Sequence, residues 1–227
     1  LALHCRSAAA LGAVTDIRHW TPFAVCRGQA DDILAKAQAA AHPEDLHVLI
    51  SKTKTWDGVA DCGSTSGSGN WGWLDCPDPS RLSDAIQQGC QSLLTLDTST
   101  TPPGYTVTGQ PGNKGDSLTA DMATLLDQPI TMPVYSTAVW NGTNATYTVV
   151  GVMTVKLCGY APKNARQAVT GSCYVTTDPV TGETVALQGD DLQVQYVRIT
   201  PIGELSTDCG LGDPLCSFNA YVTPLID

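Results

Sequence analysis

The hydrophobic and polar positions divide the chain into an early part with helical periodicity and a late part that alternates like β-strands. Residues 28–45 (GQADDILAKAQAAAHPED) run from an acidic first turn through helix-forming alanines to a proline, which predicts a helix. A second helix is predicted from Ser80 to Gln88, because a proline precedes it and Gly89 follows it. Residues 113–129 (NKGDSLTADMATLLDQP) carry one apolar stripe and predict a third helix.

Strand-like alternation dominates the second half of the chain and also occurs once before it. ITMPVYSTAVW (130–140) and ATYTVVGVMTVKLCGY (145–160) flank the turn signal NGTN, which predicts a long β-hairpin. DDLQVQYVRITPIGEL (190–205) predicts a last long strand, and LHVLISKTKTW (46–56) predicts an earlier one. Because helices cluster early and strands late, we expect an α+β fold, an antiparallel β-sheet with about three helices.

Charge and cysteine content indicate an extracellular protein. Twelve basic and 22 acidic side chains give a net charge of −10 over 227 residues, which argues against nucleic acid or an anionic membrane surface as a partner. No two cysteines have C-x-x-C spacing, so the pattern is typical of disulfides formed in an oxidising compartment rather than of a local zinc site. The nine cysteines are Cys5, Cys26, Cys62, Cys76, Cys90, Cys158, Cys173, Cys209 and Cys216.

The disulfide pairing is not determined by the sequence, but short separations suggest local pairs. We expect Cys158–Cys173, Cys209–Cys216, and Cys76 with either Cys62 or Cys90. A closed loop of about 15 residues would stabilise the fold by roughly 3 kcal/mol in the chain-entropy model. Because nine is odd, at least one thiol is free, is paired between chains, or has its partner outside this sequence.

Export of the chain is expected although no export signal is visible in it. The sequence does not begin with Met and holds no apolar run of about 18 residues, the length that spans a membrane. Because the cysteines imply an oxidising compartment, we expect that a signal or membrane anchor lay upstream and was removed. The expected location is the cell surface or the extracellular space.

One glycine-rich stretch matches a nucleotide-binding pattern without its context. Gly67, Gly69 and Gly72 fit G-x-G-x-x-G, which binds a pyrophosphate only between a strand and a helix. A small polar run precedes the stretch, and Pro77 and Pro79 follow it and disfavour a helix. The sequence therefore predicts a tight turn beside bulky indoles, and no cofactor is expected.

Two clusters of reactive side chains each have a structural alternative. Cys26 lies between His19 and His47 in the sequence and would serve as a Cys-His nucleophile, but the composition favours a disulfide at this cysteine. Asp190 and Asp191 would contribute to a calcium site, but two adjacent carboxylates supply too few oxygens. A turn before the last strand is therefore the favoured interpretation of the two aspartates.

Tryptophans and glycosylation sequons also have two interpretations. The indoles either stack on a ligand or pack a core, and packing beneath the glycine-rich loop is favoured. They are Trp20, Trp56, Trp71, Trp73 and Trp140. Asn141 and Asn144 each begin a formal sequon, but an Asn-Gly turn before a Thr-rich strand also produces that pattern, and whether the sequons are used stays open.

Several motifs in a fixed order resemble those of a known family. GSGNWGWLDCPDPSRLSDAIQQGC, QPGNKGDSLTADMATLLDQPITMPVY, NATYTVVGVMTVKLCGY and QVQYVRI follow one another between residues 56 and 200. Together they are similar to the ectodomain of TadE/TadG-type proteins of the bacterial tight-adherence (Flp) pilus system. The residues that correspond to the family's G-N-[FW]-G-W-L-D motif are Gly69, Asn70, Trp71, Gly72, Trp73, Leu74 and Asp75.

The resemblance implies a surface-exposed domain carried on an N-terminal transmembrane segment, without established enzymatic residues. It implies that Trp71 and Trp73 are packing anchors and that Asp75 forms a turn or cap. We therefore expect a TadE/TadG-like ectodomain at 56–200, an N-terminal helical and strand region at 1–55 packed on it, and a cysteine-containing tail at 201–227. This sequence departs from the family in lacking the anchor and in having more cysteines.

The expected function is a non-catalytic component of pilus assembly, or a minor-pilin-like protein, that contacts other pilus or envelope proteins. Membrane attachment is expected only through the missing anchor. One alternative is a secreted module that binds carbohydrate or another ligand through exposed indoles. Another is a secreted hydrolase that uses paired carboxylates or Cys26.

Overall fold

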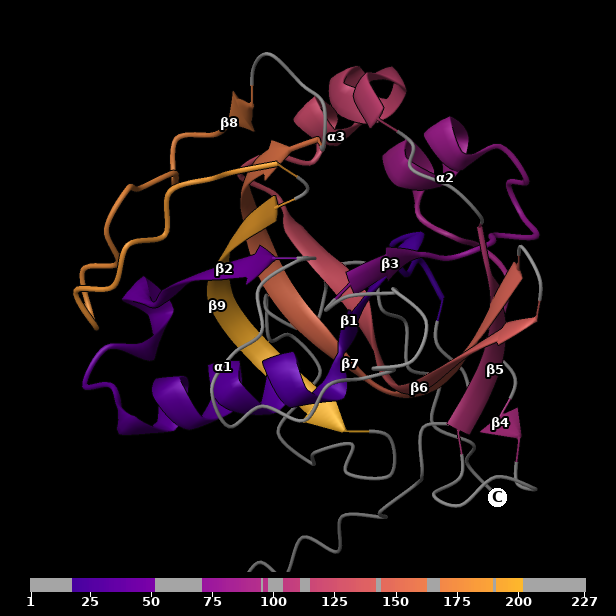
Figure 1. Cartoon of the computed structure of the whole chain (residues 1–227), viewed down its shortest axis with the longest axis horizontal. Helices are drawn as coiled ribbons and strands as arrows, with labels where there is room; N and C mark the ends of the chain where they lie inside the picture. The colour runs from indigo at the N-terminus through magenta and orange to yellow at the C-terminus, as the bar shows by residue number, and fades with distance from the viewer. Residues whose placement is uncertain are drawn as a thin grey trace, which may run out of the picture.

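The computed structural model describes residues 18–51, 71–94, 96–97, 104–110, 115–141, 144–162, 168–189 and 191–201. These residues form a curled β-sheet with helices against one part of it (Figure 1). The helical elements are α1 (Arg27–Ala39), η1 (Pro43–Asp45), α2 (Leu82–Gln88), η2 (Gly115–Leu118) and α3 (Thr119–Thr124). The strands are β1 (Phe23–Cys26), β2 (His47–Ser51), β3 (Trp71–Trp73), β4 (Leu96–Asp97), β5 (Gly104–Gly109), β6 (Pro129–Asn141), β7 (Asn144–Ala161), β8 (Val169–Thr170) and β9 (Asp191–Pro201).

The sheet order is β2-β9-β7-β6-β1-β3, and the predicted hairpin forms its centre. β6 and β7 pair in antiparallel fashion from Pro129–Lys156 to Asn141–Asn144. The expectation of an antiparallel sheet is wrong at one pair, because β1 runs parallel to β6. A parallel neighbour requires a crossover, and the long chain path between these two strands supplies it.

Strands around β7 close into a ring. One edge of β7 pairs with β6, while the other edge is shared between β5 at its start and β9 at its end. The chain beyond β3 bridges to β5 through Leu74 and Gly109, and Gln110 N–H donates to the Trp73 carbonyl at 3.0 Å. Hydrogen bonding therefore runs without a break through β6, β1, β3, β5 and β7 and back to β6.

Two buried clusters lie on opposite faces of the ring strands. On β1, Phe23 and Val25 face one cluster, while Ala24 and Cys26 face the other, as the two-residue period of a strand requires. The helix cluster lies under the helices and includes Ile33 of α1. The ring cluster comprises Trp20, Ala24, Cys26, Leu74, Cys76, Ala85, Cys90, Leu94, Tyr105, Val107, Tyr135, Ala138, Ala145, Tyr147 and Val149.

The first two predicted helices are confirmed, and the third is shorter than predicted. α2 ends at Gly89, whose φ of +73° lies in the region that glycine adopts without strain. The predicted 113–129 helix is instead η2 followed by α3. The helix cannot extend to the end of that range because Asp127 has a φ of +63°, which reverses the chain before β6.

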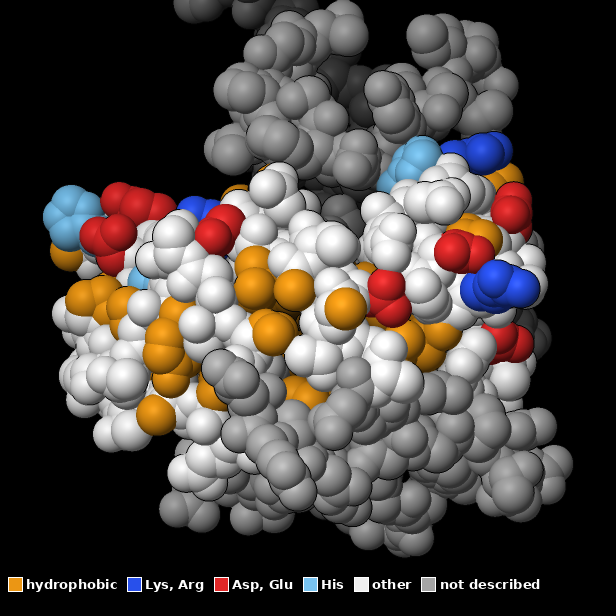
Figure 2. Space-filling model, turned by 90° about the horizontal axis from the view of Figure 1, so that it is seen from above, with side chains coloured by type: hydrophobic (Ala, Val, Ile, Leu, Met, Phe, Trp, Pro, Cys, Tyr) orange, Lys and Arg blue, Asp and Glu red, His pale blue; other side chains and the backbone are white. Residues whose placement is uncertain are grey.

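Elements from the first part of the chain belong to the same sheet as those from the middle. β1 and β2 pair with β6 and β9, respectively. Among the described residues no helix is both long and apolar enough to cross a membrane. On the face shown in Figure 2, hydrophobic side chains occur in small separate groups, and acidic side chains lie towards both ends and between them.

Candidate functional site

The family-like motif on β3 is buried, and its side chains alternate between the two clusters. Trp71 and Trp73 face the helix cluster with exposed fractions of 0% and 3%, and Leu74 faces the ring cluster. The two indoles meet edge to face with ring centroids 5.4 Å apart, and Phe23 packs 5.6 Å from Trp73. Edge-to-face contact suits the opposite charge of aromatic edges and faces, so the indoles form a packed core.

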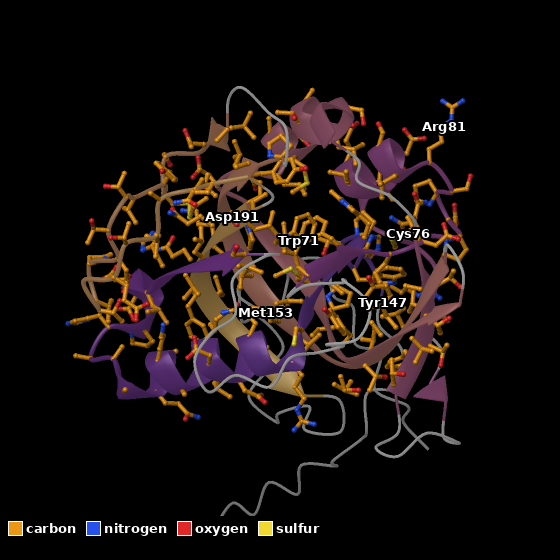
Figure 3. The ribbon with its side chains drawn as sticks, viewed as in Figure 1. Trp71, Cys76, Arg81, Tyr147, Met153 and Asp191 are labelled. Atoms are coloured by element: carbon orange, nitrogen blue, oxygen red, sulfur yellow. A yellow bond between two sulfur atoms is a disulfide. The ribbon has the colours of Figure 1, made fainter. Side chains whose placement is uncertain are left out.

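Gly72 and Gly109 make room for one tyrosine. A Cβ atom at Gly72 would collide with the Tyr147 hydroxyl, and one at Gly109 would collide with the edge of the same ring. Tyr147 packs edge to face on Tyr135, with centroids 4.9 Å apart. Burial raises the pKa of Tyr147 to about 12. Figure 3 shows Tyr147 beside Cys76, both of the ring cluster, while Trp71 and Met153 of the helix cluster lie nearer the centre.

Asp75 ends the motif at the surface and contacts the neighbouring strand β5 and the residue after it. Its backbone N–H donates to the Thr108 carbonyl at 2.7 Å, and its carboxylate accepts from the Gln110 side-chain amide at 3.1 Å. The residue therefore helps to join β3 to β5. Gly69 and Asn70, the first two residues of the motif, lie outside the described residues.

Two of the predicted disulfides are present. Cys158 pairs with Cys173, as predicted, and the Cα atoms are 5.1 Å apart. Cys76 pairs with Cys90 across 5.7 Å, which decides between the two partners that the sequence left open. Cys62, Cys209 and Cys216 lie outside the described residues.

The Cys-His nucleophile is not formed. Cys26 is fully buried and disulfide-bonded, so it offers no free thiol. His47 is also buried, and its Nδ1 lies 2.8 Å from the Asp45 carbonyl and 3.9 Å from the Asp178 carboxylate. The hydrolase hypothesis through Cys26 is therefore wrong.

Two carboxylates of the described residues, the buried Asp178 and the partly exposed Asp127, accept hydrogen bonds from backbone N–H groups. Asp178 is buried, which disfavours its charged form, yet hydrogen bonds from Thr181 and from the His47 N–H outweigh this and lower its pKa. Asp127 accepts from the N–H groups of Ser172 and Cys173, which lowers the pKa of Asp127.

Asp191 forms the predicted turn. Its carboxylate accepts from the Gln188 N–H at 2.9 Å, and its own N–H donates to the Gln188 carbonyl at 3.1 Å. The two residues close a turn just before β9, which confirms the turn interpretation of this aspartate. Asp190 lies outside the described residues.

Three tryptophans are described with their side chains, and all three are buried. Trp71 and Trp73 lie in the helix cluster and Trp20 lies in the ring cluster, where its indole N–H donates to the Ser92 carbonyl at 3.0 Å. Trp56 lies outside the described residues, and only the backbone of Trp140 is described. These three indoles form no ligand-stacking surface. Asn141 and Asn144, the first residues of the two sequons, face each other where the β6–β7 hairpin closes.

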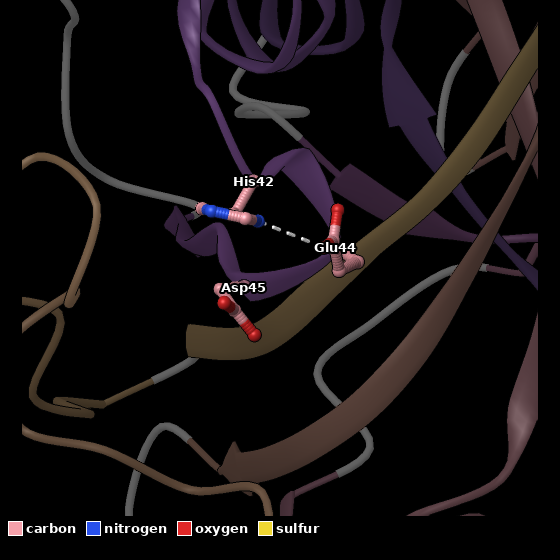
Figure 4. Close-up of side chains that lie close together, drawn as sticks. All are labelled: His42, Glu44 and Asp45. Carbon is pink, nitrogen blue, oxygen red and sulfur yellow. Dashed lines mark hydrogen bonds and ion pairs between the residues drawn. The ribbon is translucent and has the colours of Figure 1, made fainter.

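One cluster of metal-ligating side chains, which the sequence reasoning missed, lies in the turn between α1 and β2. His42, Glu44 and Asp45 are exposed, and their potential ligand atoms all lie within 4.8 Å of one another (Figure 4). His42 Nδ1 lies 3.3 Å from a Glu44 carboxylate oxygen. A hydrogen bond to the Glu44 carboxylate from its own backbone N–H, and then the contact with His42, lower the pKa of Glu44. The available sequence signal was the short run HPED.

Two hollows lie beside the elements described above. One of about 320 Å³ adjoins His42 and Asp45, with Pro179 and Val180 on its other side. The other, of about 190 Å³, lies between α2 and the start of β6 and is lined partly by the side chains of His19 and Gln128. No charged carboxylate, lysine or arginine lines this second hollow among the described residues.

Comparisons of the chain with protein-family models, with curated proteins and with solved structures each found no match.

Proposed function

We propose that the chain is a non-catalytic component of pilus assembly, or a minor-pilin-like protein, that works through protein–protein contacts. The observation that carries this proposal is the way the motifs of the resemblance pack on one another. Gly72 of the GNWGWLD motif receives Tyr147 of the ATYTVVG motif, and Tyr147 packs on Tyr135 of the ITMPVY motif. Motifs far apart in the sequence thus pack on one another, which supports interpreting them as one structural unit.

Several polar side chains of the described residues hold the backbone in place, which supports a scaffold rather than a reaction centre. The carboxylates of Asp127, Asp178 and Asp191 accept hydrogen bonds from backbone N–H groups, as groups that hold loops in place do. The side-chain amide of Gln193 likewise binds the Val175 and Val185 carbonyls at 2.6 Å. A rigid, cross-linked fold is suited to a protein that acts through surface contacts, because a preorganised surface loses less conformational freedom on binding.

Export is part of the proposal. Two disulfides among the described residues are consistent with an oxidising compartment. Under this proposal the chain is exported to the cell surface and contacts other envelope or pilus proteins there. The net charge of −10 would favour partners with basic contact surfaces.

Immunogold labelling of the cells that produce the protein tests the proposal. Antibody against the folded chain should label thin surface fibres or their bases on wild-type cells, and a strain that lacks the gene should show no label. Loss of the gene should also reduce the number of fibres per cell. Label confined to the culture fluid, with unchanged fibres, would overturn the proposal and favour a secreted binding module.

A further inference from the structure

The turn between α1 and β2 presents a nitrogen ligand and two carboxylates on one small patch. His42, Glu44 and Asp45 place one ligand atom each within 4.8 Å of the others, and the His42–Glu44 pair is at 3.3 Å. In a mononuclear site with metal–ligand distances of about 2.1 Å, ligand atoms lie roughly 3 to 4 Å apart. Small rotations of these exposed side chains would therefore bring all three ligand atoms to one ion.

The backbone of this turn is held by neighbouring strands, so the three side chains start from a fixed base. The Gln195 amide on β9 donates to the Glu44 carbonyl at 2.7 Å, and the Tyr196 N–H donates to the Leu46 carbonyl at 2.8 Å. The buried His47 ring lies 2.8 Å from the Asp45 carbonyl. A site on an anchored turn loses less conformational freedom on binding than one on a free loop.

Mixed nitrogen and oxygen ligands select among cations. Magnesium and calcium prefer all-oxygen sites, whereas zinc is bound by imidazole together with carboxylates in three-ligand sites that keep a position open. The net charge of −10 raises the local concentration of any divalent cation around the protein.

We propose that His42, Glu44 and Asp45 bind one Zn²⁺ ion, with the remaining coordination positions open to water or to a side chain from another molecule. His42 would bind through Nδ1, the ring nitrogen that faces the Glu44 carboxylate. The adjoining hollow of about 320 Å³ next to Pro179 leaves the open positions accessible. The site stands independently of the pilus proposal.

Calorimetric titration of untagged, chelator-treated protein with ZnCl₂ tests the site. We expect one ion per chain with micromolar affinity. His42→Ala and Glu44→Gln should each weaken binding about tenfold or more, because each removes a ligand. Asp31→Asn is the matched control: it also removes a negative charge from an exposed position of the α1 region and should change the affinity less than about twofold.

Amide NMR spectra recorded during the titration locate the ion. Addition of Zn²⁺ should shift the signals of residues 42 to 47, and the variants should keep the wild-type spectrum elsewhere, which shows that they are folded. The proposal is overturned if millimolar Zn²⁺ produces no heat and no shifts. It is also overturned if His42→Ala and Glu44→Gln bind as the wild type does, because the ion would then lie elsewhere.

Discussion

The helix cluster and the ring cluster are both buried but are stabilised in different ways. The helix cluster joins apolar side chains of α1, α2 and α3 to one face of the sheet, and its aromatic members lie on β1, β3 and β7. The ring cluster is enclosed by strands and contains the Cys76–Cys90 disulfide and the paired Tyr135 and Tyr147 rings. Burial of apolar area stabilises the helix cluster, whereas close packing and a disulfide bond stabilise the ring cluster.

The two described disulfides give the largest expected effect. They close loops of almost equal length, but only Cys76–Cys90 lies in the ring cluster, and Cys158–Cys173 lies in neither cluster. The sequence separations are 14 and 15 residues, so the chain-entropy model assigns each about 3 kcal/mol. Cys76→Ala/Cys90→Ala should cost about 4 kcal/mol, since it also leaves a gap in the buried ring cluster. Cys158→Ala/Cys173→Ala should cost about 3 kcal/mol, because Cys173 is partly exposed.

Urea denaturation of the two double variants measures both losses. Equal losses, or a larger loss for the Cys158–Cys173 pair, would contradict a special role for the ring disulfide.

Gly72→Ala tests the fit inside the ring. The added methyl group collides with the Tyr147 hydroxyl, and we expect a loss of about 3 kcal/mol in the free energy of unfolding. Because the nearest atom is the hydroxyl oxygen, adding Tyr147→Phe should recover part of that loss. The double-mutant cycle from chemical denaturation gives the coupling energy, and strictly additive losses would show that the two residues do not meet.

Alkaline unfolding should report on Tyr147. Its pKa is raised to about 12 in the folded protein, so the unfolded chain releases this proton first, from about pH 10. Stability is therefore unaffected below pH 10 and falls as the pH rises towards 12, by about 2 kcal/mol from this residue. Tyr147→Phe should remove that share of the pH dependence, measured by urea titrations at several pH values. A pH profile identical to that of the wild type would contradict the burial of the hydroxyl.

A substitution at Gln29 of α1 should have the smallest effect, a gain in the stability of the protein. Its side chain is fully buried, and neither amide atom has a hydrogen-bond partner among the residues that the structure describes. Gln29→Leu removes this unsatisfied group and should stabilise the protein by about 1 kcal/mol. Gln38→Leu, at an exposed position of the same helix, is the control and should change stability little. Thermal unfolding measures both, and a loss at Gln29 would contradict the prediction.

The parts of the fold that local patterns encode were predictable. The β6–β7 hairpin followed from two alternating segments around a turn signal, and α1 followed from alanines between an acidic start and Pro43. The turn at Asp191 followed from its place before a strand. The shortness of the η2–α3 segment was not predictable. Its end depends on Asp127, whose carboxylate accepts a hydrogen bond from the backbone N–H of Ser172, 45 residues further on.

The candidate zinc site was missed for a related reason. The sequence pattern typical of a zinc site is a set of cysteines and histidines at metal-ligand spacing, whereas His42, Glu44 and Asp45 are one imidazole and two carboxylates in a polar turn. What distinguishes the turn is the anchoring of its carbonyls by Gln195 and His47, and neither contact is visible from the four letters HPED.

The sequence by itself determined most of the local elements and the net negative charge, because periodicity and composition are local properties, and it suggested the disulfide between Cys158 and Cys173 from their short separation. Only the tertiary structure decided that β1 lies parallel to β6, that Cys76 pairs with Cys90, and that Cys26 has no free thiol. The tertiary structure also decided that Gly72 leaves the space that the Tyr147 hydroxyl needs, although the two residues are 75 positions apart in the chain. The physical reason is that long-range pairing depends on close packing, which brings distant side chains together only in the folded molecule.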